Sequence, residues 1–161
     1  MSVTIEIATQ SKAWEKLPGA EAAVRRAVEA ALREECVEEG EIGVMLTDDS
    51  GIQALNKSFR ATDKATNVLA FPAPKHSGNG PKPIGDIVLA YETLTREAES
   101  EGKPALHHLM HLAVHATLHL LGFDHIDDAD ADTMEARERA ILATLDVADP
   151  YAWHENAGAM V

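Results

Sequence analysis

The chain has 161 residues, of which 45% are hydrophobic and 25% charged, a composition typical of a soluble globular protein rather than of a disordered or fibrous one. This length suits one hydrophobic core, so residues 1–161 are expected to form a single domain. A net charge of −13 argues against a uniformly basic nucleic-acid surface, and 4% aromatic residues exclude a stacking surface of many rings.

Alternation of apolar and polar residues predicts strands at 3–8 and 41–47. Between them, apolar residues at helical spacing predict a helix at 20–39, ended by Gly40. Cys36 is expected to pack as a small residue on this helix. These elements already mix strands with helices.

The rest of the chain also alternates between predicted helices and strands. A helix capped by Asp48 or Asp49 is expected to run to about residue 59. Further along, the pattern predicts a strand at 67–71, a proline-rich loop at 73–84, a strand at 85–90, and helices at 95–101, 106–121 and 130–145. About four strands covered by helices indicate an α+β fold with a small mixed sheet.

Three features indicate a cytoplasmic protein. No apolar run approaches the roughly 18 residues of a membrane span, so no membrane contact is expected. The first ten residues lack a basic and an apolar signal region. Cys36 is the single cysteine, so a disulfide within the chain is excluded.

Six of the eight histidines lie between residues 107 and 125. His111, His115 and His119 share one face of the predicted helix, because they are four residues apart. Buried imidazoles need polar partners, and a metal ion can satisfy several of them together. The alternative is a histidine-rich buried helix whose rings are hydrogen-bonded without metal.

The reach of the side chains selects three ligands for one zinc ion. His111 and His119 are about 12 Å apart along a helix, too far to share an ion. Gly122 can end the helix in a left-handed conformation and return the chain toward it. We therefore predict a site of His115, His119 and His125, with the fourth position open as in catalytic zinc sites.

Ala116 stands where the zinc-protease motif has a glutamate that acts as general base. The helix therefore offers ligands for zinc but lacks the usual proton acceptor. A zinc peptidase or amidase becomes the weaker alternative. A non-catalytic zinc-binding protein is a further alternative.

Three segments follow one another along the chain: LNKSFRATDKATNVLAFP at 55–72, GDIVLA at 85–90 and HATLHLLGFDH at 115–125. All three resemble segments of the YbeY-type bacterial endoribonucleases. The last is similar to the family signature H-G-x-L-H-L-x-G-Y-D-H, with Ala116 for Gly and Phe123 for Tyr.

This resemblance implies a zincin-like fold and three histidines on zinc. It implies a single-strand-specific endoribonuclease that acts in 16S rRNA 3′-end maturation and ribosome quality control. The expected partners are single-stranded ribosomal RNA and the ribosome or its small-subunit proteins. A non-catalytic, ribosome-associated zinc protein is the alternative within this interpretation. The sequence gives no indication of the oligomeric state.

The charge distribution locates the RNA-binding surface. Residues 51–110 carry seven basic and six acidic groups and are the only third of the chain that is not strongly acidic. The family's arginine corresponds to Arg60, which could hold a phosphate and stabilise developing charge as a catalytic residue. Lys57 and Lys64 are expected to assist substrate binding. Without the resemblance, a surface ion pair would be the ordinary interpretation of Arg60.

Overall fold

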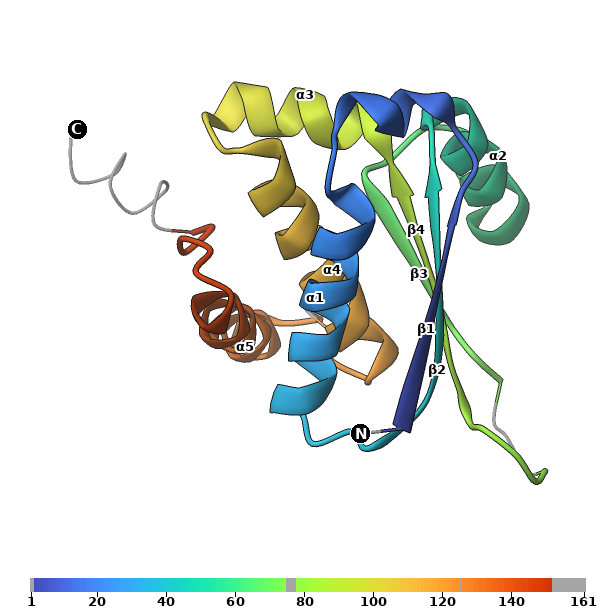
Figure 1. Cartoon of the computed structure of the whole chain (residues 1–161), viewed down its shortest axis with the longest axis vertical. Helices are drawn as coiled ribbons and strands as arrows, with labels where there is room; N and C mark the ends of the chain where they lie inside the picture. Colours follow the sequence, from blue (N-terminus) through green and yellow to red (C-terminus); the bar gives the residue numbers. More distant parts are fainter. Residues whose placement is uncertain (1, 75–77, 125, 152–161) are drawn as a thin grey trace.

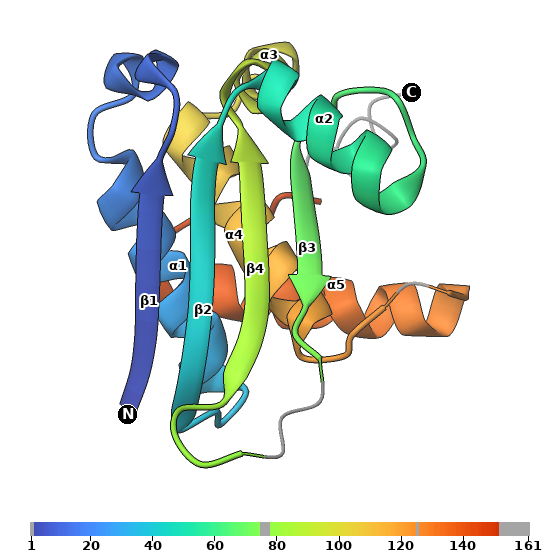
Figure 2. The same cartoon turned by 90° about the vertical axis from the view of Figure 1, so that its right-hand side faces the viewer.

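The computed structural model describes residues 2–74, 78–124 and 126–151. The described residues form one mixed sheet with the strand order β1-β2-β4-β3 (Figure 2). Neighbours among β1, β2 and β4 run parallel, and the short edge strand β3 runs antiparallel to β4. The strands are β1 (Ser2–Thr9), β2 (Glu39–Thr47), β3 (Val68–Pro72) and β4 (Pro83–Ala90). The predicted α+β fold with a four-stranded mixed sheet is confirmed.

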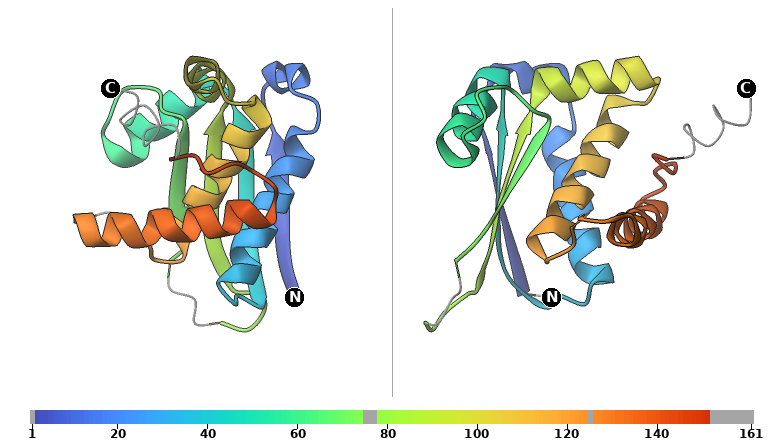
Figure 3. Two further views of the ribbon diagram at one scale, coloured as in Figure 1. Left: turned by 90° about the vertical axis from the view of Figure 1, so that its left-hand side faces the viewer. Right: turned by 180° about the vertical axis from the view of Figure 1, so that it is seen from behind.

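Helices cover the two faces of the sheet unequally. The helices α1 and α4 pack against one face, and α5 crosses outside them (Figures 1 and 3). On the opposite face, α2 covers an apolar cluster that includes Ile52, Leu69 and Val88. The helical segments are the 3-10 turn Lys12–Lys16, α1 (Ala20–Glu34), α2 (Asp49–Arg60), α3 (Tyr91–Glu101), α4 (Ala105–Leu120) and α5 (Asp128–Thr144).

The central helix is α4, because it lies between the sheet and α5. Leu109, Ala113 and Leu118 are fully buried on it, as expected for a helix that is apolar nearly all round. Gly85 in β4 allows the close approach of this helix. A Cβ atom there would lie 2.6 Å from Leu120 Cδ2 and 2.5 Å from the carbonyl oxygen of Phe71. The glycine therefore brings the end of α4 against β3 and β4.

The structure corrects the prediction around Cys36. The helix α1 ends at Glu34 rather than 39, because Cys36 adopts a left-handed conformation (φ 59°) and Leu32 O accepts the N–H of Val37. Cys36 is exposed and does not pack on the helix. Gly40 does not end a helix. It lies in β2, where it pairs with Val3 of β1.

The helix expected at 95–101 begins earlier, at Tyr91. No helix among the described residues has the length and apolar character needed to cross a lipid bilayer.

Candidate functional site

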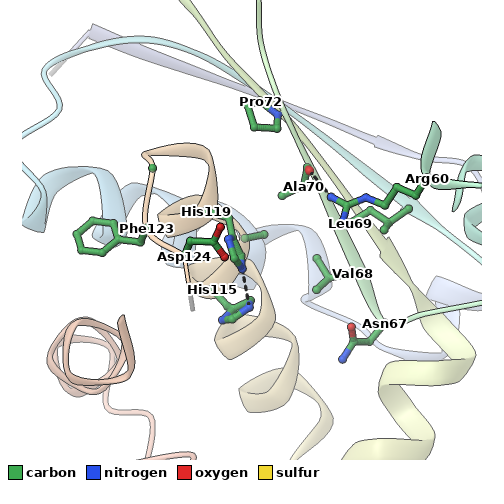
Figure 4. Close-up of a pocket in the computed structure, with 12 residues that line it drawn as sticks. Arg60, Asn67, Val68, Leu69, Ala70, Pro72, His115, His119, Phe123 and Asp124 are labelled. Carbon is green, nitrogen blue, oxygen red and sulfur yellow. Dashed lines mark hydrogen bonds between the residues drawn. The ribbon is translucent and has the colours of Figure 1, made fainter. Parts of the chain in front are cut away.

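A pocket of about 450 Å³ lies between β3 and the end of α4 (Figure 4). Two groups of residues line it. The α4 wall consists of His115, Ala116, His119, Gly122, Phe123 and Asp124. The β3 wall consists of Arg60, Asn67, Val68, Leu69, Ala70 and Pro72. The structure therefore brings His115, His119 and Arg60 to one pocket, although 55 residues or more separate the two histidines from the arginine in the sequence.

The rings of His115 and His119 converge within the pocket. They lie one helical turn apart on α4, and their Nε2 atoms are 3.2 Å from each other. Two nitrogens that bind one tetrahedral zinc ion at 2.0–2.1 Å would be roughly 3.3 Å apart. The spacing of this pair therefore fits two ligands of one ion.

The chain turns back after α4 as the sequence predicts. Gly122 adopts a positive φ of 102°, and Leu118 O accepts the N–H of Phe123 at 3.0 Å. The turn places Asp124 on the pocket, while the predicted third ligand, His125, lies outside the described residues. Within 2–74, 78–124 and 126–151, no group of three or more His, Cys, Asp or Glu residues could hold a metal ion. The ligand set of three histidines therefore stays a prediction.

Sequence reasoning missed Glu138, a fully buried carboxylate on α5. His115 Nδ1 lies 2.5 Å from Glu138 Oε1, and the hydroxyl of Tyr151 donates to Oε2. Burial alone would raise the pKa of Glu138, but the hydrogen bonds and charges of His111 and His115 lower it from 4.5 to about 2. Burial and the Glu138 carboxylate raise the pKa of Tyr151, which keeps its proton.

A signal for Glu138 was present in the sequence. On α5 it shares one face with Met134, Ile141 and Leu142, which are all fully buried. A glutamate at an apolar position of a helix indicates a buried carboxylate with a specific partner.

Arg60 is the last residue of α2 and reaches the edge of β3. Its Nη2 donates to the carbonyl oxygen of Ala70 at 3.0 Å, and its guanidinium lies 5.7 Å from the ring centre of Phe71. A guanidinium has five N–H donors, so this contact leaves capacity for a phosphate. Arg60 is exposed and faces the pocket across from the histidine pair.

The two predicted lysines, Lys57 and Lys64, do not line the pocket. Lys57 is on α2, where its Nζ is 3.9 Å from Asp63 and its side chain is 68% exposed. Lys64 is exposed in the loop that follows. Asn67, by contrast, is fixed on the β3 wall because its amide donates to Glu97 at 2.9 Å. Both lysines can therefore attract bound RNA only by long-range electrostatics, or contact it where the strand extends beyond the pocket.

A family model described as Endoribonuclease YbeY matches residues 6–146. Relatives with the name Endoribonuclease YbeY are similar over most of the chain. One from Rhodopseudomonas palustris (strain BisB5) is 51% identical, covering 91% of this chain and 80% of its own. Another, from Bradyrhizobium sp. (strain BTAi1), is 50% identical and covers 95% of both chains.

A protein from Thermotoga maritima, solved in solution, has a similar fold. It superposes with a TM-score of 0.58 at 21% identity and covers 95% of this chain and 93% of its own. Enzymes of the YbeY family are metal-dependent, and their name states that RNA is the substrate. From the family match and the identity of about half the residues, this chain belongs to the endoribonuclease YbeY family and is a hydrolase that cleaves RNA.

Proposed function

We propose that this chain is a zinc-dependent, single-strand-specific endoribonuclease that acts in 16S rRNA 3′-end maturation and ribosome quality control in the cytoplasm. Residues 1–161 would work as one domain, with one zinc ion held by His115, His119 and His125. The ribosome or its small-subunit proteins would present the RNA.

The observation that carries the proposal is the composition of one pocket. Two imidazole nitrogens lie 3.2 Å apart on the α4 wall, and a guanidinium lies on the β3 wall. Phosphodiester hydrolysis needs such a pair of features, because negative charge develops on the phosphoryl oxygens while a bond to phosphorus forms.

Each wall has its own task in this proposal. Arg60 binds a phosphate oxygen and balances the charge that develops on it. His115 and His119 hold the metal, which supplies Lewis-acid chemistry when bound. Asp124 is the single carboxylate among the described lining residues, and Ala116 leaves the glutamate position of zinc proteases without an ionisable group. The last feature supports RNA rather than peptide cleavage.

The test is cleavage by protein purified without a histidine tag. Single-stranded RNA, the same sequence as a duplex, and a peptide mixture are incubated with the protein before and after treatment with a chelator, and after zinc is restored. We expect cleavage of the single strand alone, its loss with chelator and its return with zinc. His115→Ala serves as the control for contaminating nuclease, and cleavage that persists in it would refute the proposal.

A further inference from the structure

The carboxylate of Glu138 contacts the face of His115 that is turned away from the pocket. Its Oε1 lies 2.5 Å from His115 Nδ1, while His115 Nε2 points toward His119. An ionised carboxylate has no proton to donate, so it acts only as a hydrogen-bond acceptor. Nδ1 of His115 must therefore carry the proton, which leaves the Nε2 of the neutral ring with a lone pair directed into the pocket.

The other oxygen of Glu138 is held by a different group. The Tyr151 hydroxyl donates to Oε2, and His111 Nε2 lies 3.5 Å from Oε1. Tyr151 and His111 also pack edge to face, with ring centres 5.6 Å apart. These contacts fix the carboxylate from behind, so that it cannot rotate away from His115.

We propose that Glu138 is a positioning residue that holds His115 in the one tautomer and orientation that can bind a metal ion through Nε2. The inference rests on the proposed function, because it assigns to Glu138 a role toward the ion that His115 would hold. A carboxylate behind a histidine ligand fixes the ring and increases its basicity as a ligand. Here the carboxylate comes from α5, so this helix takes part in the site without lining the pocket.

The matched control is a second carboxylate that contacts a histidine of α4. Glu97 on α3 has its Oε1 2.9 Å from His108 Nε2, its side chain is 38% exposed, and neither residue lines the pocket. Glu97 also accepts a hydrogen bond from Asn67 on the β3 wall, so the control is measured as zinc affinity, to which that wall contributes no proposed ligand. If any loss of a histidine–carboxylate contact on α4 weakened metal binding, Glu97→Gln would do so as well. If Glu138 acts through His115, only changes at Glu138 will do so.

The experiment measures zinc affinity by competition with a chromophoric chelator. Glu138→Met keeps an unbranched side chain of similar size on a face that already contains Met134, so it is expected to fold. Glu138→Gln keeps an acceptor oxygen but removes the charge. We expect zinc affinity to fall roughly 10–100-fold in Glu138→Met, less in Glu138→Gln, and not to change in Glu97→Gln. Wild-type affinity in folded Glu138→Met would overturn the inference.

A second measurement needs no variant and no metal. Nitrogen-15 NMR of the metal-free wild-type protein at about pH 8 reports which ring nitrogen of His115 carries the proton. We expect the proton on Nδ1, and a dominant Nε2–H form would overturn the inference. If the wild-type protein instead binds no zinc while His115 carries its proton on Nδ1, the proposed function fails but the contact with Glu138 stands.

Discussion

The two walls of the pocket are built on opposite principles. The α4 wall rests on a buried helix, and behind it the ring of His115 is held by a fully buried carboxylate. The β3 wall is an edge strand with an exposed arginine that reaches it from α2. The first wall fixes atoms in place, and the second presents a charged group that can adjust to its ligand. This difference matches the needs of a metal ion, which requires set distances, and of a flexible RNA strand, which does not.

Removing a proposed metal ligand from the α4 wall should have the largest effect. In His119→Ala we expect the metal to be lost and RNA cleavage to fall more than about a hundredfold, because Lewis-acid stabilisation is worth several kcal/mol. Metal analysis of tag-free protein and a cleavage assay measure both effects. Full zinc content in a His119→Ala/His125→Ala double variant would contradict the predicted ligand set. A structure in which His111 binds the metal in place of His125 would show that only the third predicted ligand is wrong.

Arg60→Ala should lower kcat/KM by about a hundredfold, because in the proposed function it removes the donor that meets the developing charge. Zinc content should not change, and the free energy of unfolding should fall by about 1 kcal/mol or less, since the residue is exposed. Arg60→Lys should recover only part of the activity, because an ammonium lacks the planar fork. A loss of thermal stability as large as that of a core truncation would show that Arg60 is structural.

Lowering the pH should remove the contribution of Glu138 to the stability of the folded protein over a defined pH range. The pKa of Glu138 is lowered from 4.5 to about 2 in the folded protein, so its contribution to stability is complete above pH 4.5 and is lost as the pH falls toward 2. The expected size is on the order of 3 kcal/mol. Chemical unfolding of metal-free wild type and Glu138→Gln between pH 6 and about 2 tests this. The stability difference between them should shrink over that interval, and a constant difference would contradict the assignment.

The charge reversal of Lys57, Lys64 and a third exposed lysine, Lys82 just before β4, should have the smallest effect. Residues 60–82 carry four basic groups and one acid, Asp63, which itself lies near Lys57. Binding of naked single-stranded RNA should therefore be weak, with a salt dependence of roughly two to three counterions, and a few-fold weaker after the reversal.

The control for this reversal introduces lysine at Asp128 and Asp132, which are exposed on the acidic helix α5. Titrations over a range of salt should show little change in this variant. Tight and steeply salt-dependent binding that survives the triple reversal would place the RNA surface elsewhere.

Local patterns were sufficient to predict the histidine pair and the turn after it. The spacing of His115 and His119 is a property of any helix, and Gly122 is a local signal for its end. The β3 wall could be assigned to the same site only through the family resemblance, because nothing in the spacing of Arg60 indicates that α2 lies beside β3. Tertiary packing brings the two walls together, and a single sequence does not display it.

Two errors have physical reasons. The length of α1 was overestimated because 35–39 contains residues that suit a helix, whereas the hydrogen bonds of β2 with β1 require an extended chain from Glu39. Glu138 was overlooked because a charged residue in an acidic helix resembles ordinary solvated surface. Its apolar neighbours at positions 134, 141 and 142 were the evidence against that interpretation.

The contact between Arg60 and Ala70 has a consequence for solubility. β3 is an edge strand, and the outward carbonyls of such a strand can pair with a strand of another molecule. By donating to Ala70 O, Arg60 occupies one of these acceptors and places a positive charge along the edge. A chain that loses Arg60 would expose this edge, so self-association at high concentration would accompany the loss of cleavage.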